Sequence, residues 1–222
     1  MKHILIVIFI ILSSEVYCQN LQIHYDYGKD RNFFTTTFEM FNPDDYGSTF
    51  WFIDFDFNQK GNKSISKAYL EIARYIKIEG FDWFEPTIQY NDGIADWGRL
   101  GPIWLGGIKR GFDLEFFKFN TELLYRNDYF SDGKDAQITI TWNEFYFDLF
   151  CFKGFFDIWT TGNDKKFTVV LTEPQLWMRV WKHLSIGIEL EFSNNFIAQN
   201  LFQINPTVAL NWNFSYKDKV AK

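Results

Sequence analysis

Residues 207–216 read TVALNWNFSY, a run in which apolar and polar side chains alternate. Val208 and Leu210 fall on one face of an extended chain, and Asn211 and Asn213 fall on the other. The reason is that successive side chains of a β-strand point to opposite faces. The run therefore predicts a strand with one apolar face and one polar face.

The same period of two recurs along the whole chain, and no stretch shows a sustained helical period. Turn-forming residues separate the runs, as at 91–93 (NDG) and 162–164 (GND). We predict about twelve strands, whose lengths suit tilted membrane-crossing strands better than the shorter strands of soluble domains. They cover residues 20–28, 32–41, 48–58, 66–78, 83–90, 102–110, 112–124, 135–145, 150–160, 167–180, 184–194 and 205–216.

The connections between these strands alternate in length. Those after even-numbered strands are mostly short, as at 42–47 and 180–183, whereas several after odd-numbered strands are longer, as at 91–101, 125–134 and 195–204. Short turns on one rim and longer loops on the other are typical of outer-membrane barrels, which have an even number of strands and termini on the periplasmic, short-turn side.

Composition decides between a membrane barrel and a soluble secreted barrel or sandwich, which would show the same alternation. Aromatic residues make up 21% of the 222 residues. The polar faces carry mostly Asn, Thr, Ser, Gln and Asp rather than Lys and Glu. Trp and Tyr recur near strand ends, as at Tyr27, Trp142, Trp212 and Tyr216, which is typical of interfacial girdles. We predict an all-β chain, a transmembrane antiparallel up-and-down β-barrel in the outer membrane of a Gram-negative bacterium.

The first 18 residues have the pattern of an export signal. A basic start at Lys2 precedes an apolar run, residues 4–12, that is too short to span a bilayer as a helix. Cleavage before Gln19 would leave residues 19–222 as a single outer-membrane β-barrel domain.

The two cysteines and the net charge limit other readings. The alternative at the N-terminus is a lipoprotein signal with Cys18 lipidated, but a lipobox has a small residue before its cysteine and Tyr17 is bulky. After cleavage only Cys151 remains, so no intramolecular disulfide can form. A net charge of −6 without a basic run argues against a nucleic-acid partner.

No strong enzyme motif is present, and we expect no cofactor and no metal site. His183 and Ser185 have the spacing of the His and Ser of outer-membrane phospholipases, which keeps an outer-membrane lipid enzyme as an alternative. However, the pair falls at a predicted periplasmic turn, with Ser185 on the polar face. His24 is expected to be a hydrogen-bonded lumen residue, because no cluster of metal ligands accompanies it.

The polar strand faces predict the lining of the lumen. If the apolar faces contact lipid, Arg179 and Lys153 cannot neutralise the lumenal carboxylates, so the lumen should be acidic and disfavour anions. The ionisable residues predicted to face the lumen also include His24, Asp26, Glu39, Asp54, Asp56, Glu71, Glu85, Asp157, Glu173, Glu189 and Glu191.

Aromatic side chains also fall on the polar face, at Phe50, Phe52, Phe155, Trp159 and Trp177. A ring beside a carboxylate could bind a flat, hydroxyl-bearing solute by stacking and hydrogen bonding. The alternative is that these side chains only pack and hydrate the interior. The predicted solute-binding residues are Phe50, Phe52, Asp54, Asp56, Glu71, Phe155, Asp157, Glu173 and Arg179.

Four stretches resemble the nucleoside-specific channel-forming (Tsx-like) outer-membrane proteins and occur in the same order. They are KAYLEIAR (67–74), GFFDIW (154–159), EPQL (173–176) and GIELE (187–191). The resemblance implies a monomeric barrel of twelve antiparallel strands whose narrow lumen binds nucleosides through aromatic and ionisable residues. The chain departs from that family in being shorter, with trimmed outer loops.

These observations together predict a channel for passive diffusion of small hydrophilic solutes, with nucleosides as the class that the resemblance implies. Its expected partners are the lipid bilayer and the solute. The alternative is a non-conducting barrel with a structural or interaction role, because the lumenal aromatic side chains could plug so small a pore.

Overall fold

The computed structural model describes residues 19–58, 64–114, 117–132, 134–147 and 149–214, with no side-chain description for residue 19 and residues 143–147. The predicted export signal and Tyr216 lie outside these ranges. The strands are β1 (Gln19–Asp26), β2 (Phe34–Asp44), β3 (Gly47–Phe57), β4 (Lys67–Ile76), β5 (Glu85–Ala95), β6 (Gly98–Arg99), β7 (Ile103–Leu114), β8 (Phe117–Asp128), β9 (Asp135–Phe147), β10 (Phe150–Thr161), β11 (Phe167–Thr172), β12 (Gln175–Arg179), β13 (Leu184–Asn194) and β14 (Phe202–Asn213).

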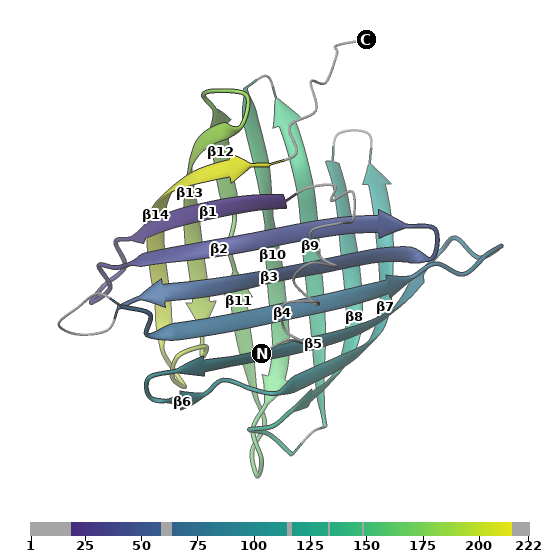
Figure 1. The fold of residues 1–222 in the computed structure, drawn as a ribbon. Helices are drawn as coiled ribbons and strands as arrows, with labels where there is room; N and C mark the ends of the chain where they lie inside the picture. Colours follow the sequence, from purple (N-terminus) through teal and green to yellow (C-terminus); the bar gives the residue numbers. More distant parts are fainter. Residues whose placement is uncertain (1–18, 59–63, 115–116, 133, 148, 215–222) are drawn as a thin grey trace, which may run out of the picture.

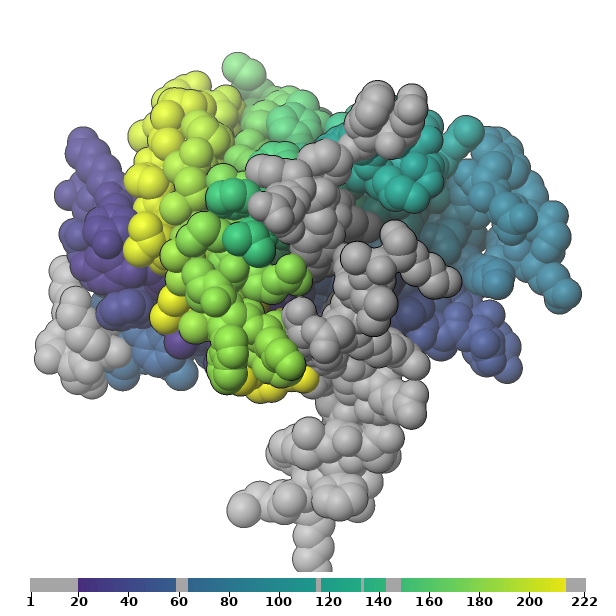
Figure 2. All heavy atoms as spheres, turned by 90° about the horizontal axis from the view of Figure 1, so that it is seen from above, coloured from purple at the N-terminus to yellow at the C-terminus, as the bar shows by residue number. Residues whose placement is uncertain are grey.

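These strands form one closed antiparallel barrel. Each pairs with its neighbours in chain order, and β14 returns to pair with β1, with Leu21 opposite Trp212. Figure 2 shows the last strand, in yellow, beside the first, in purple. The barrel has twelve crossings, because β6 only extends the β5 connection and β11 and β12 share one crossing between β10 and β13. The front and back walls cross in Figure 1, as expected for tilted strands.

The two faces of the wall have opposite chemistry. Outward side chains are apolar and exposed, such as Ile94 at 64% and Leu123 at 56%, whereas inward side chains are polar and buried, such as Gln22 at 1% and Glu122 at 2%. A contiguous apolar exterior of this kind is unstable in water and matches a hydrocarbon environment. The described residues contain no helix that is long and apolar enough to span a membrane.

The connections gather on two rims. The turn rim holds 45–46, 77–84 and 180–183 and also the ends of the barrel at Gln19 and Asn213; the loop rim holds 27–33, 96–102, 129–134, 162–166 and 195–201. The predicted alternation is therefore observed, except that 77–84 on the turn rim is as long as the loops.

Aromatic side chains cluster outside the barrel near both rims. Tyr27 is exposed at the end of β1 on the loop rim, and Trp212 lies near the turn rim. The ring of Trp142 stacks on Phe152 at 5.8 Å. Rings at these heights are in the position of interfacial girdles, which agrees with the prediction.

Several predicted strand boundaries were wrong. β5 continues to Ala95 instead of ending at 90, and β7 runs through Gly111, which pairs with Asn120, to Leu114. The strand predicted at 167–180 is broken at Pro174, since proline cannot donate a backbone hydrogen bond to the ladder. Asparagine and glycine within the strands were read as turns in the first two cases.

Candidate functional site: the barrel lumen

All nine predicted solute-binding residues occupy lumen-facing register positions. Phe52 lies between Glu39 and Glu71 on its neighbouring strands, and Asp54 lies between Thr37 and Tyr69, so these side chains share one face of the wall. The same holds on β10, where Phe155 and Asp157 pair with the inward Thr141 and Thr139. The structure therefore confirms the predicted orientation of Phe50, Phe52, Asp54, Asp56, Glu71, Phe155, Asp157, Glu173 and Arg179, while their role in binding solute stays a prediction.

Seven of these nine side chains are partly accessible inside the barrel. Asp56 is buried against Lys67, with 2.8 Å between the carboxylate and the ammonium, and Arg179 is exposed at the turn rim. The other seven come from β3, β4, β10 and the 173–174 break, and they surround the middle of the lumen. We call these seven the central lane: Phe50, Phe52, Asp54, Glu71, Phe155, Asp157 and Glu173.

An ion pair crosses the lumen beside the central lane. The Nζ of Lys153 on β10 donates to both carboxylate oxygens of Glu39 on β2, at 3.1 and 3.3 Å. Asn20 and Gln22 on β1 also donate to this carboxylate, at 3.1 and 3.4 Å. β10 and β2 are five strands apart around the ring of twelve, so the contact joins nearly opposite walls.

This contact requires the barrel to be flattened. A circular barrel of twelve strands spaced about 4.8 Å and tilted about 40° would be about 24 Å across. Extended Lys and Glu side chains joined by a hydrogen bond reach only about 14 Å between Cα atoms. Glu71 on β4 and Asp157 on β10 both face the space between these walls. The walls at β2–β4 and at β10 therefore approach each other and leave a lobe on either side.

The first lobe, walled by β11–β14 and β1, is filled by one large ring. Trp177 is 3% exposed, donates from its indole N–H to Gln175 at 2.9 Å, and meets His24 edge-on at 5.9 Å. It lies over Gly187 on the next strand, where an added Cβ would come within 2.4 Å of the indole. Glycine at 187 therefore makes the space that Trp177 occupies.

The second lobe, walled by β5 and β7–β9, contains an apolar cluster inside the barrel. Ile103, Leu105 and Leu124 pack together there, although the alternation predicted polar side chains on this face. Beneath them Glu122 accepts hydrogen bonds from the Tyr75 hydroxyl at 2.8 Å and from Gln89 at 2.5 Å. Both lobes are thus occupied by buried side chains.

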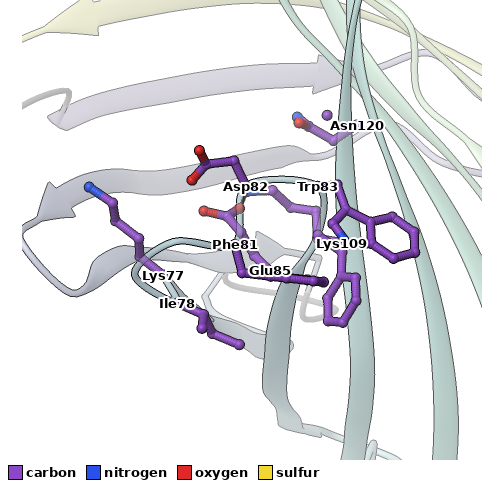
Figure 3. Close-up of a pocket in the computed structure, with 10 residues that line it drawn as sticks. Lys77, Ile78, Phe81, Asp82, Trp83, Glu85, Lys109 and Asn120 are labelled. Carbon is purple, nitrogen blue, oxygen red and sulfur yellow. Dashed lines mark ion pairs between the residues drawn. The ribbon is translucent and has the colours of Figure 1, made fainter.

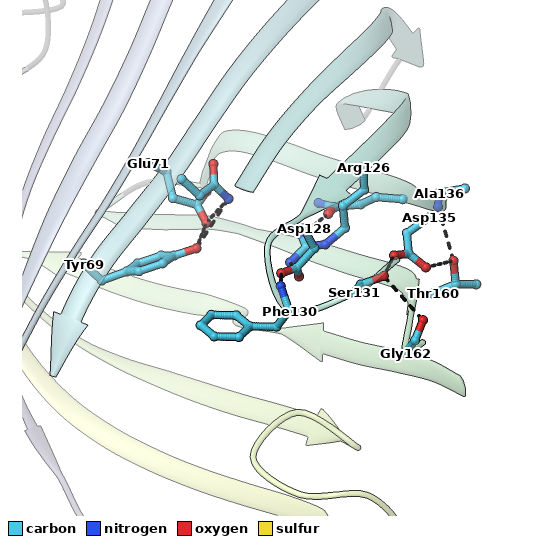
Figure 4. Close-up of polar contacts among 12 residues, drawn as sticks. Tyr69, Glu71, Arg126, Asp128, Phe130, Ser131, Asp135, Ala136, Thr160 and Gly162 are labelled. Atoms are coloured by element: carbon cyan, nitrogen blue, oxygen red, sulfur yellow. Dashed lines mark hydrogen bonds and ion pairs between the residues drawn. The ribbon is translucent and has the colours of Figure 1, made fainter. Parts of the chain in front are cut away.

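The loop-rim end of the lumen is held by a polar network, drawn in Figure 4. The Arg126 guanidinium binds Asp128 at 3.0 Å and stacks over the Trp159 ring, while Tyr69 donates to Glu71 at 2.7 Å. Nearby, Asp135 accepts hydrogen bonds from three side chains on neighbouring segments: Ser131, Thr160 and Lys166. This network ties β8, β9 and β10 to the connections above them.

Lys166 also links two connections on the loop rim, because its ammonium donates to Asp132 as well as to Asp135. The hydrogen bond from Lys166 is the main reason that the pKa of Asp132 lies below its ordinary value of 3.8. The contact joins 129–134 to 162–166 at the mouth of the barrel.

Sequence reasoning missed three lumenal cations and several carboxylates. Lys67 and Lys109 follow the same alternation and could have been counted, while Arg126 lay beyond the predicted end of its strand at 124. Each pairs with a neighbour: Lys109 with Glu85 at 2.9 Å, for example. Among the described residues, the central-lane carboxylates of Asp54, Glu71, Asp157 and Glu173 form no salt bridge. The lumen therefore has more cations than predicted, but its centre is acidic as predicted.

A cavity of about 260 Å³ opens at the turn rim, between the 77–84 connection and strands β7 and β8 (Figure 3). Phe81 and Trp83 supply an aromatic wall, and Lys109 and Asn120 face it from the strands. The Lys109 ammonium also sits 3.8 Å from the centre of the Tyr75 ring. The cavity forms a vestibule at the lumen mouth.

His183 and Ser185 point away from each other. The His183 ring stacks on the outward-facing Trp212, with 5.4 Å between centroids, and its Nδ1 bonds the backbone carbonyl of Asn213 at 2.7 Å. Ser185 faces the lumen opposite Asn211. This geometry does not place a His base beside a Ser nucleophile.

Comparison with known sequences gives one family. The sequence profile described as "Domain of unknown function (DUF5020)" matches residues 18–214. A search of curated proteins gives no match.

Comparison with solved structures identifies small outer-membrane porins. The KdgM porin matches with a TM-score of 0.56 at 8% identity, covering 90% of this chain and 100% of that chain. The NanC porin matches at 0.57 and 12%, covering 87% and 98%. Omp33, an outer membrane protein of Acinetobacter baumannii, matches at 0.52 and 7%, covering 90% and 99%. KdgM in complex with disordered oligogalacturonate matches at 0.54 and 7%, covering 90% and 100%.

At these identities the comparisons establish the fold, which is that of a closed twelve-stranded outer-membrane barrel. Together with the apolar outer face, this fold places the chain in the outer membrane.

Proposed function

The chain belongs to the DUF5020 family, and we propose that it is a narrow outer-membrane channel for passive diffusion of small hydrophilic solutes. The observation that carries the proposal is the central lane, a partly accessible and polar stretch in the middle of a closed barrel. The porins KdgM and NanC have the same fold. We propose that the channel acts as a monomer after removal of residues 1–18.

The charge of the central lane favours cationic and neutral solutes. Four carboxylates without a salt bridge lie within a low-dielectric wall, which raises the local concentration of cations and repels anions. KdgM, in contrast, has been solved with oligogalacturonate, an acidic oligosaccharide. We therefore propose that the two barrels share a fold and differ in the sign of the charge that they admit.

Nucleosides are the finer candidate within this class. Phe52 lies directly between Glu39 and Glu71, and Phe155 lies next to Asp157 on the same strand face. A base could stack on such a ring while the carboxylates accept hydrogen bonds from the ribose hydroxyls. The resemblance of residues 67–74 and 154–159 to nucleoside channels supports the same class.

The test is single-channel recording of the purified mature chain in a planar bilayer with a KCl gradient. The proposal predicts steady conductance, a reversal potential on the side of cation selectivity, and block by nucleosides added to one chamber. Liposome swelling with nucleosides and neutral sugars gives a second readout. Anion selectivity in a protein shown to be folded would contradict the proposed charge preference.

The packing of the two lobes favours a second candidate, a non-conducting structural barrel. Trp177 fills one lobe, and Leu105 and Leu124 are each 2% exposed in the other. A folded protein that neither conducts nor permits swelling would favour this candidate over the channel.

A further inference from the structure

We propose that the ion pair between Lys153 and Glu39 is the constriction of the lumen, and that it sets the size of the solute that can pass. The inference rests on the proposed channel function and adds the residues that determine its selectivity. The inference rests on geometry. Of the salt bridges among the described residues, this one joins nearly opposite walls of the barrel, through two hydrogen bonds donated by one ammonium to one carboxylate.

Two irregularities of the wall lie next to Lys153. The β9–β10 register shifts between Phe152 and Gly154, where three residue steps on β9 (Phe145 to Trp142) face two on β10, so β9 carries the extra residue and bends beside Lys153. Gly154 has a φ of 155°, and an added Cβ there would lie 2.6 Å from the backbone oxygen of Glu173. On the other side of β10, the neighbouring strand is broken at Pro174 between β11 and β12, so both irregularities lie next to the residue that crosses the lumen.

Glu39 is held in place from the other side. Asn20 and Gln22 donate to its two oxygens, and Gln22 also bonds Asn20 at 2.9 Å and His24 at 3.0 Å. The carboxylate is therefore fixed by a chain of hydrogen bonds along β1, and Lys153 meets an acceptor that is already oriented. A flexible side chain that met an unanchored partner would be a poor barrier, whereas this pair is anchored at the carboxylate end.

The ion pair restricts a solute mainly by its size and less by its charge. The pair joins the walls at β2 and β10, so a solute must pass beside it through the lane lined by Phe52, Glu71 and Asp157 or displace it. The pair itself carries no net charge. Its removal should widen the lumen whichever partner is lost, whereas the two losses change the lumen charge in opposite directions.

The test uses these opposite changes in the charge of the lumen. Single-channel conductance and reversal potential are measured for Glu39→Ala and Lys153→Ala in planar bilayers. Both variants should raise the conductance about twofold or more, because both open the same gap. Cation selectivity should rise in Lys153→Ala and fall in Glu39→Ala. The double exchange E39K/K153E keeps both the pair and the net charge and should conduct like the wild type.

Lys67→Ala and Asp56→Ala are the matched controls. They remove the same charges from an ion pair between adjacent strands, so they should shift selectivity without a comparable gain in conductance. Folding of every variant is checked by heat-modifiable migration in gels. If a single variant fails to fold, the E39K/K153E exchange still tests the pair, and a conductance unlike the wild type would then overturn the inference.

The outcomes separate this inference from the proposed function. A conducting wild type whose conductance rises in one single variant and falls in the other shows a charge effect alone and overturns the constriction. Equal changes in bridge and control variants overturn it as well. A silent wild type with conducting bridge variants supports it. Silence of the wild type and all variants overturns the channel function itself, and the constriction with it.

Discussion

Gly154→Ala should destabilise the barrel far more than the same substitution elsewhere. The new methyl group would lie 2.6 Å from the Glu173 backbone oxygen and 2.8 Å from the Trp142 ring, at a φ of 155°. Backbone in so sparsely populated a region costs about 1–3 kcal/mol for a residue other than glycine. Overpacking against atoms that cannot move adds about 1–3 kcal/mol. The expected loss is therefore about 2–6 kcal/mol.

Gly106→Ala is the matched control for that substitution. Gly106 is also a strand glycine, but an added Cβ there has no neighbouring atom within 4 Å. Alanine should leave stability unchanged or raise it by up to about 1 kcal/mol, because it restricts the unfolded chain. Urea unfolding of both variants in detergent micelles, followed by tryptophan fluorescence, measures the difference. Equal midpoints for the two variants would refute the reasoning about the bulge.

Three further predictions concern separate parts of the molecule. Tyr75→Phe removes a donor from the buried Glu122 carboxylate and should lower the free energy of unfolding by about 1–3 kcal/mol in the same urea assay. The Asp132 carboxyl should titrate below its ordinary pKa of 3.8 in an NMR titration. Because that pKa is lowered on folding, the contribution of its contact with Lys166 is present above about pH 4 and is lost as the pH falls through the folded pKa. Mass spectrometry of the protein from outer membranes should show a chain that begins at Gln19.

Each of these has its own control. Tyr90→Phe removes a hydroxyl that bonds Asp92 on the outer face, and its effect should be smaller than that of Tyr75→Phe. In Lys166→Ala the carboxyl of Asp132 should return to its ordinary pKa; an unchanged titration would contradict the assigned cause. A mature mass that includes an acylated Cys18 would support the lipoprotein alternative instead.

The alternation of side chains predicted the barrel because its cause is local. Each run such as 185–192 shows which face meets lipid, and this property does not depend on the partner strand. The predicted orientation of all nine site residues was correct for the same reason. The errors at Gly111 and Pro174 arose where a turn-forming residue sits inside a strand, because its pairing depends on neighbours that are distant in sequence.

The contacts across the lumen could not be predicted from the sequence. Alternation indicates that Lys153 and Glu39 both face inward, but their 114-residue separation hides that they meet. The meeting depends on the flattening of the barrel, which no local pattern of side chains indicates. Likewise, alternation assigns apolar side chains to the lipid face, so it did not predict the apolar cluster around Leu124 inside the lumen.

The pairing of β14 with β1 also constrains how the protein is made. Asn20 on β1 pairs with Asn213 on β14, and this seam between the two strands closes the barrel. The seam therefore cannot form until nearly the whole chain has been synthesised and has crossed the inner membrane. Until then both seam strands present unpaired backbone groups, which recruit other strands and lead to aggregation. A chain that stops before β14 should therefore leave the edge of β1 unpaired, and we expect it to aggregate rather than insert as a smaller barrel.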